Sequence, residues 1–209
     1  MGLFSKQGIE IHKAFKIQAL NRIQILNILA ENYQLKSYLE IGVQEPRNCL
    51  LKVNCLTKVG VDPAVSHPLV YRTTSDNFFA SNTKKFDLIF IDGLHEYDQV
   101  KKDFMNALKV LNDNGFIMLH DTMPLQKETT EVPRKTKMWH GDVYRLVLEL
   151  WKYCKYITID TDNGCTVCWK GNSRDRVDVP SNWESFLQHQ DYMHIKRPHE
   201  IDFGNIRKY

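Results

Sequence analysis

Short apolar stretches alternate with helical patterns along most of the chain. Five stretches are predicted to be strands: 37–43, 58–62, 69–73, 86–92 and 116–120. The last two are apolar almost throughout, as strands covered on both faces must be, and are expected at the centre of a sheet. Strands that alternate with helices in this order predict an α/β fold with a mostly parallel sheet.

Apolar residues at helical spacing mark the segments between and around these strands. Residues 9–33 predict an N-terminal helix, 97–111 a helix ended by Asn114-Gly115, and 143–151 a further helix. Residues 156–161 and 166–170, joined by a turn at 162–164, predict a closing β-hairpin.

The pattern divides the chain into three parts. Residues 1–36 form an N-terminal helical segment, 37–170 the α/β domain, and 171–209 a C-terminal extension. Trp183, Phe186 and Tyr192 in the extension indicate that it packs on the domain or on a partner subunit, so a homo-oligomer stays open. A total of 209 residues is enough for one core.

Composition narrows the classes of partner. With 28 Lys plus Arg against 25 Asp plus Glu, the net charge of +3 gives no reason to expect nucleic-acid binding. No apolar run has the length of a membrane span, so a cytoplasmic protein without a membrane partner is expected. Five cysteines, an odd number, predict reduced thiols. Cys165 and Cys168 lie in an expected strand and point to opposite faces, which disfavours zinc.

The carboxyl ends of the first two strands carry acidic residues. In open parallel sheets the ligand binds outside the carboxyl ends of the strands, where the strand order reverses. Glu40 precedes Gly42 and Val43 at the first strand end, and Asp62 precedes Pro63 at the second. An acid at the second position can accept hydrogen bonds from both hydroxyls of a ribose. These positions indicate a nucleoside-containing ligand.

Together with residues 86–93 and 115–121, these positions resemble the class I S-adenosylmethionine-dependent methyltransferases over residues 37–170. The similarity is greatest to bacterial small-molecule and sugar O-methyltransferases of the macrocin type. It implies a Rossmann-like fold with a mostly parallel seven-stranded sheet, a C-terminal β-hairpin and helices on both faces. It also implies S-adenosylmethionine as cofactor, bound by Glu40, Gly42, Val43, Asp62, Pro63, Ser75, Asp76, Asp92 and Gly93. In that arrangement Glu40 and Gly42 lie near the methionine end, Asp62 at the ribose, and Ser75 with Asp76 near adenine.

One position departs from the family pattern. The family commonly has a second glycine four residues after the first, where this chain has Pro46, so the cofactor loop is expected to turn differently or to bind less tightly. A nicotinamide-dependent oxidoreductase is an alternative, but its G-x-G-x-x-G fingerprint is absent because Gly42 stands alone. A catalytically silent cofactor-binding scaffold is the other alternative.

Two neighbouring strands end in groups that can do chemistry. Asp92 and His95 follow the fourth strand, and His120 and Asp121 follow the fifth. Metal-dependent members of the resembling families bind a divalent ion, usually magnesium, at the positions of Asp92, His120 and Asp121. An imidazole ligand shifts preference from magnesium toward manganese, iron or zinc. In the alternative reading, His120 hydrogen-bonds within its loop and Asp121 caps a turn.

The expected reaction is O-methylation of a sugar or another small-molecule hydroxyl. Such a transfer needs an aligned oxygen nucleophile and removal of one proton. His95 is the predicted general base, with Asp92 beside it, although His95 could instead hydrogen-bond at the start of the following helix. The basic loop before Trp139 would suit an acidic acceptor such as a nucleotide sugar, and is equally consistent with a solvated loop.

Overall fold

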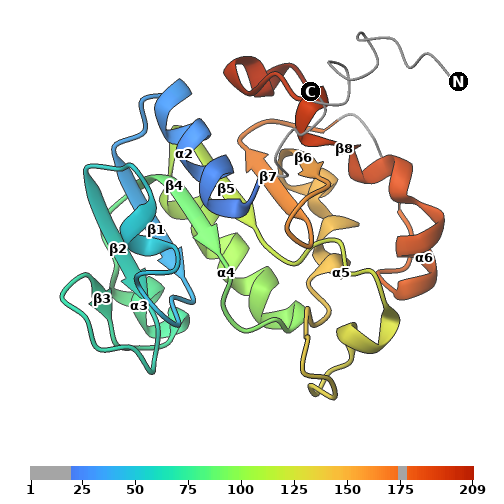
Figure 1. Ribbon diagram of the computed structural model, residues 1–209, viewed down its shortest axis with the longest axis horizontal. Helices are drawn as coiled ribbons and strands as arrows, with labels where there is room; N and C mark the ends of the chain where they lie inside the picture. The colour runs from blue at the N-terminus through green and yellow to red at the C-terminus, as the bar shows by residue number, and fades with distance from the viewer. Residues whose placement is uncertain (1–19, 174–177) are drawn as a thin grey trace, which may run out of the picture.

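The computed structural model describes residues 20–173 and 178–209, which share one mixed sheet (Figure 1). The sheet runs through the middle of the molecule, from the teal β2–β3 edge to the orange and red β6–β8 edge. In these residues it has eight strands in the order β3-β2-β1-β4-β5-β7-β6-β8. Their bounds are β1 Ser37–Ile41, β2 Thr57–Val61, β3 Val70–Tyr71, β4 Phe86–Ile91, β5 Leu111–Leu119, β6 Lys155–Ile159, β7 Cys165–Trp169 and β8 Ile195–Lys196.

The strand directions define where a ligand can bind. The first five strands pair in parallel, β7 is antiparallel to β5 and β6, and β8 is parallel to β6. The chain builds outward from β1 to β2 and β3, then returns to place β4 on the other side of β1. The strand order therefore reverses between β1 and β4, and their carboxyl ends open the crevice that open α/β sheets use for ligands.

Helices cover both faces of the sheet. The α-helices are α2 Arg22–Asn32, α3 Ser75–Ser81, α4 Tyr97–Val110, α5 Tyr144–Val147 and α6 Trp183–Gln188. Short 3-10 helices are η1 Leu50–Lys52, η2 Lys127–Thr130, η3 Leu150–Lys152, η4 Gln190–Met193, η5 Pro198–Glu200 and η6 Phe203–Lys208. One core packs α3 to α6 on one face, and the other packs α2, η1 and η6 on the opposite face.

The alternating pattern of the sequence matches this layering. In β4 the alternate residues Leu88 and Phe90 belong to the α2 core, while Ile89 and Ile91 belong to the α4 core. All four are at most 2% exposed, which explains why the strand is apolar throughout. Cys165 and Cys168 are likewise divided between the two cores, as their spacing predicts. The predicted Rossmann-like class I fold is confirmed.

Several element boundaries differ from the predictions. The predicted helix over 97–111 ends at Val110, and Asn114-Gly115 lies inside β5, at a register irregularity against β4, instead of stopping the helix. The predicted helix over 143–151 is reduced to α5 and η3. Of the helix predicted over 9–33, residues 9–19 lie outside the described residues.

The C-terminal extension adds the eighth strand to the seven predicted. β8 pairs with β6 over Thr158↔Ile195 and Ile159↔Lys196. Phe186 packs edge-on against Tyr144 with ring centroids 4.9 Å apart. Within the described residues, no helix has the length and apolar character needed to cross a membrane.

Candidate functional site

A cavity of about 840 Å³ opens at the carboxyl ends of β1, β2, β4 and β5. Its volume falls in the range usual for small-molecule and cofactor sites. All twelve residues expected from the sequence to bind the cofactor, bind a metal or take part in catalysis line this one cavity. They are Glu40, Gly42, Val43, Asp62, Pro63, Ser75, Asp76, Asp92, Gly93, His95, His120 and Asp121.

Gly42 holds the two central strand ends close together. Its φ of +84° lies in the left-handed region, and its N–H donates to the Val61 carbonyl at 2.9 Å. A Cβ atom at this position would lie 2.3 Å from the Asp92 carbonyl oxygen and 2.4 Å from the Gly93 Cα. Glycine is therefore required here by both conformation and space.

The loop after Gly42 contains Pro46 at the position where the resembling family commonly has a second glycine. Gln44 adopts a left-handed conformation with φ +53°, and the Leu51 N–H donates to the Pro46 carbonyl at 2.9 Å. The connection contains only the three-residue helix η1. In this described segment no α-helix begins after β1. The segment therefore lacks the helix N-terminus that binds the pyrophosphate of a dinucleotide.

Asp62 organises the loops at the ends of β1 and β2. Its Oδ2 accepts hydrogen bonds from the N–H groups of Val43 at 3.1 Å and Gln44 at 2.9 Å. Its Oδ1 accepts from Ala64 at 2.8 Å and Val65 at 3.2 Å. The carboxylate thus shapes the cavity wall on its own, and a ribose would have to share its lone pairs with these donors.

Glu40 is a buried acid, with 1% of its surface exposed. Tyr38 donates its hydroxyl proton to Glu40 Oε2 at 2.6 Å, and Cys49 Sγ lies 3.6 Å from the same hydroxyl. Burial raises the pKa of Glu40 to about 7, against the opposing effect of the Tyr38 hydrogen bond. The carboxyl can therefore be neutral or charged near neutral pH, depending on what occupies the cavity.

Ser75 and Asp76 lie in the first turn of α3, where Thr74 caps the helix. Gln99 donates from Nε2 to Ser75 Oγ at 3.1 Å and to Asp76 Oδ1 at 3.3 Å. Lys102 pairs with Asp76 Oδ2 at 2.6 Å. Helix α4 thereby fixes the far end of the cavity.

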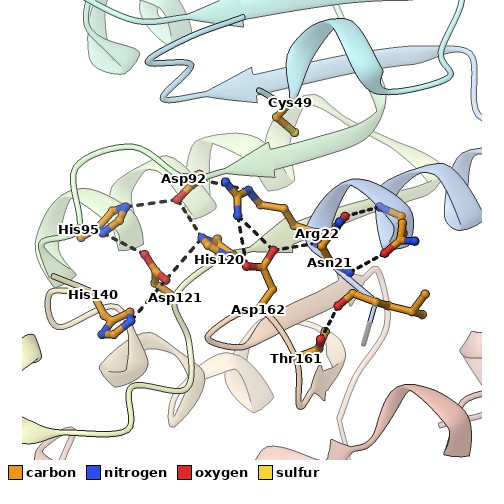
Figure 2. A network of polar contacts seen from close by, with 12 residues as sticks. Asn21, Arg22, Cys49, Asp92, His95, His120, Asp121, His140, Thr161 and Asp162 are labelled. Atoms are coloured by element: carbon orange, nitrogen blue, oxygen red, sulfur yellow. Dashed lines mark hydrogen bonds and ion pairs between the residues drawn. The ribbon is translucent and has the colours of Figure 1, made fainter. Parts of the chain in front are cut away.

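A partly buried cluster of acids and imidazoles lies at the other end of the cavity (Figure 2). Asp92 Oδ1 lies 3.3 Å from His95 Nε2 and 3.2 Å from His120 Nδ1. Although burial acts to raise it, the hydrogen bonds from His120 and His95 hold the pKa of the Asp92 carboxyl well below its usual range. Asp92 is therefore a permanent anion beneath the cavity.

His95 bridges the ends of β4 and β5. Its Nδ1 lies 3.2 Å from Asp121 Oδ2 and 3.3 Å from the Trp139 carbonyl oxygen, and its ring stacks on Trp139. Burial lowers the pKa of His95, but the hydrogen bond to Asp92 and the charges of Asp121 and Asp92 outweigh burial and raise it. Both ring nitrogens are engaged, so a role as base requires an arriving acceptor hydroxyl to replace one of these contacts.

His120 and Asp121 are more deeply buried, each 6% exposed. Burial lowers the pKa of His120, yet Asp162 and Asp92 outweigh it and raise the pKa to about 10. Burial raises the pKa of Asp121 and prevails over the opposing charges of His120 and His95. His120 Nε2 and Asp121 Oδ1 have no hydrogen-bond partner among the described residues.

Two charged residues of the cluster were missed by the sequence analysis. Arg22, the first residue of α2, pairs through Nη1 with Asp162 Oδ2 at 3.1 Å, and its Nε lies 4.0 Å from Asp92 Oδ2. Asp162 also accepts the Arg22 backbone N–H at 2.9 Å and lies 3.7 Å from His120 Nε2. In the sequence, Asp162 indicates only a hairpin turn. Arg22 and Asp162 are 140 residues apart, so no local sequence pattern predicts their contact.

The expected metal ligands are grouped differently by the structure. Within the described residues, Asp92, His95 and Asp121 each place one ligand atom within 4.8 Å of the others. His120 joins a second such group with Asp162 and Cys165. His95 and His120 therefore both lie against the two carboxylates, with His120 Nδ1 3.2 Å from Asp92 Oδ1 and 3.5 Å from Asp121 Oδ1.

Comparison with known proteins finds similarity to methyltransferases, in the sequence of one segment and in the fold. Residues 56–122 match the family model described as a methyltransferase domain. The fold is similar to a Staphylococcus aureus protein provisionally assigned as a caffeoyl-CoA O-methyltransferase, with 14% identity, TM-score 0.52 and coverage of 80% of this chain and 93% of that one. It is also similar to a Podospora anserina methyltransferase with S-adenosylhomocysteine bound, with 13% identity, TM-score 0.52 and coverage of 82% and 99%. No curated protein matches the sequence significantly.

The family match covers the ends of β2, β4 and β5, where Asp62, Asp92 and Asp121 lie, and the structural similarity extends over four fifths of the chain. At these identities the structural similarity establishes the fold alone, and the family match is limited to residues 56–122. The chain therefore has the fold of the class I methyltransferases, as its motifs predict, and residues 56–122 match a methyltransferase domain.

Proposed function

We propose that this protein transfers the methyl group of S-adenosylmethionine to a hydroxyl group of a sugar or another small molecule. The observation that carries the proposal is the single cavity at the strand-order reversal, lined by every residue expected to serve the cofactor or the chemistry. Four different strand ends contribute to it, so the agreement does not depend on one local motif.

The cavity offers complementary groups for each part of the cofactor. Glu40 and Asp92 supply negative charge for the ammonium group of the methionine end, and Asp62 lies at the second strand end for the ribose. Ser75 and Asp76 line the remaining end, where adenine is expected. When bound, S-adenosylmethionine supplies a methyl group on a positively charged sulfur. The protein's part is to hold donor and acceptor in line and to exclude water.

We assign removal of the acceptor proton to His95. Its ring lines the cavity, contacts Asp92 and Asp121, and is held flat against Trp139. Once an acceptor hydroxyl displaces one of the carboxylates from the ring, the freed nitrogen can take the proton while the other carboxylate stabilises the resulting charge. Asp92 orients the ring in this scheme.

The same cluster fits a divalent cation. Asp92 and Asp121 would hold the ion, because their ligand atoms lie within 4.8 Å of each other and beside His95, which keeps its role as base. The buried Asp121 Oδ1 has no hydrogen-bond partner among the described residues, as expected of an atom that binds an ion. His120, the ligand proposed from the sequence, adjoins this group at 3.2 Å from Asp92 Oδ1. When bound, such an ion lowers the pKa of a coordinated hydroxyl.

The alternatives are less consistent with the site. A nicotinamide enzyme needs a helix N-terminus after β1 for the pyrophosphate, and η1 does not provide one. A silent scaffold has no need for two buried histidines, His120 and His140, beside the buried Asp121, because burying such groups carries a cost in folding free energy. All five cysteines are free thiols, which suits the reducing cytoplasm in which we place the reaction.

A methyl-transfer assay tests the proposal. Purified protein with labelled S-adenosylmethionine is expected to label at least one member of a panel of sugars, nucleotide sugars and phenols. Chelation is expected to lower the transfer about tenfold or more, and added Mn²⁺ or Mg²⁺ to restore it, because a bound ion contributes several kcal/mol to the transition state. Undiminished transfer by metal-free protein would remove the cation from the scheme. Cofactor binding with no transfer to any hydroxyl acceptor would favour the silent scaffold.

A further inference from the structure

His140 is a buried histidine that neither the sequence analysis nor the proposed reaction uses. It is 4% exposed and lines the cavity beside Asp121. Its Nδ1 shares a hydrogen bond of 2.8 Å with Thr129 Oγ1, and its backbone N–H donates to the Thr129 carbonyl at 2.9 Å. These two contacts fix the ring and leave Nε2 as its available nitrogen.

The free nitrogen faces a free carboxylate oxygen. His140 Nε2 and Asp121 Oδ1 lie 4.0 Å apart, both are buried, and neither has a hydrogen-bond partner among the described residues (Figure 2). The separation is too long for a hydrogen bond. It suits two ligands of one divalent ion, which at ~2.0–2.2 Å from the metal stand about 3–4 Å apart.

The other oxygen of Asp121 has a separate role. Asp121 Oδ2 contacts His95 Nδ1 at 3.2 Å, whereas Oδ1 is directed toward His140 and lies 3.5 Å from His120 Nδ1. The carboxylate can therefore hold His95 with one oxygen and bind an ion with the other.

The segment that carries His140 is locked against the site. Gly141, with φ +60°, passes so close to His95 that a Cβ atom would lie 1.7 Å from the His95 carbonyl oxygen. The Asp142 N–H then donates to that same oxygen at 3.1 Å, and Asp142 Oδ1 accepts the Tyr97 N–H at 2.6 Å. His140 is thus positioned by a rigid connection to the start of α4, which favours a preformed ligand.

We propose that His140 Nε2 and Asp121 Oδ1 are ligands of the divalent ion, and that this imidazole makes the site select Mn²⁺ over Mg²⁺. The proposal rests on the proposed function, whose metal it specifies. Magnesium takes oxygen ligands almost exclusively, whereas imidazole suits the transition metals. His140 comes from the loop that precedes α5, so the loop facing the acceptor also completes the metal centre.

Metal binding by the full chain tests the proposal without reference to turnover. Titration of wild-type protein with Mn²⁺, followed by electron paramagnetic resonance, is expected to show tighter binding of Mn²⁺ than of competing Mg²⁺. His140→Ala is expected to weaken Mn²⁺ binding about tenfold or more, because losing a ligand costs at least as much as losing a group that supports one. The nitrogen coupling in the pulsed spectrum should correspond to one imidazole fewer, and added free imidazole should restore it.

Two further variants keep the outcome interpretable. His199→Ala removes an exposed histidine of the C-terminal extension and is expected to leave Mn²⁺ binding unchanged. His140→Gln fills the same space if the alanine variant folds poorly, and it should also weaken Mn²⁺ binding. Wild-type affinity and unchanged nitrogen coupling in both His140 variants would overturn the proposal and indicate a water between the two atoms. Wild-type protein that binds S-adenosylhomocysteine but no Mn²⁺ would overturn it while leaving the proposed methyl transfer intact.

Discussion

Replacing His95 with alanine is expected to lower turnover ~10²–10⁴-fold, the range that positioned proton transfer contributes. The substitution removes the ring between Asp92 and Asp121 and leaves both carboxylates without that partner. The binding of S-adenosylhomocysteine should stay nearly unchanged, because Asp92 is the cofactor-binding residue beside His95 and it keeps its hydrogen bond to His120. Single-turnover kinetics with calorimetric measurement of cofactor affinity checks both parts.

His95→Gln separates proton transfer from positioning. Glutamine can hydrogen-bond to one of the two carboxylates and support the loop, but it cannot accept the proton. We therefore expect turnover as low as in the alanine variant, with the melting temperature closer to that of the wild-type protein. Near-normal turnover in the glutamine variant, or a parallel loss of cofactor binding, would assign His95 to structure and leave the proton to the metal or to His120.

Gly42→Ala is expected to destabilise the fold by ~2–4 kcal/mol and to abolish measurable cofactor binding. The new methyl group would lie 2.3 Å from the Asp92 carbonyl oxygen, so β1 and β4 must separate where the cofactor is expected. Overpacking accounts for ~1–3 kcal/mol and the left-handed backbone for ~1 kcal/mol more. Denaturant unfolding and calorimetric titration measure the two effects.

Gly93→Ala is the matched stability control. It lies next to the same contact, but the atom nearest to its added Cβ would be Ile41 Cγ2 at 3.5 Å, an ordinary van der Waals distance. Its free energy of unfolding should stay close to that of the wild-type protein. Equal destabilisation by the two substitutions would contradict the assigned role of Gly42.

The central strands could be predicted from the sequence because burial on both faces leaves an unmistakable apolar run. Phe86–Ile91 was predicted to within one residue for this reason. The two-residue strand β8 has no such run, since its pairing with β6 is set by the tertiary path of the C-terminal extension. Asn114-Gly115 misled the prediction because a glycine in a strand irregularity and a glycine after a helix look alike in one sequence.

The residues of the site also fall into those that the sequence predicts and those that it does not. Asp62, Asp92 and Asp121 could be found because each follows directly after an apolar strand, and parallel strands bring such positions to one edge. Arg22, His140 and Asp162 reach the cluster from a helix start, a long loop and a hairpin turn. The local sequence does not predict that these side chains reach the cluster, since their contacts depend on how these peripheral segments pack.

Calorimetric titration of the purified protein with S-adenosylhomocysteine, with NAD⁺ as the competing ligand, tests the central claim most directly. We predict saturable binding of S-adenosylhomocysteine and none of NAD⁺. Asp62→Ala should weaken that binding by ~2–4 kcal/mol through the loss of charge-assisted hydrogen bonds. Its melting temperature must be measured alongside, because Asp62 also holds four backbone N–H groups. Binding of NAD⁺ but not of S-adenosylhomocysteine, or unchanged affinity in a well-folded Asp62→Ala protein, would contradict the account.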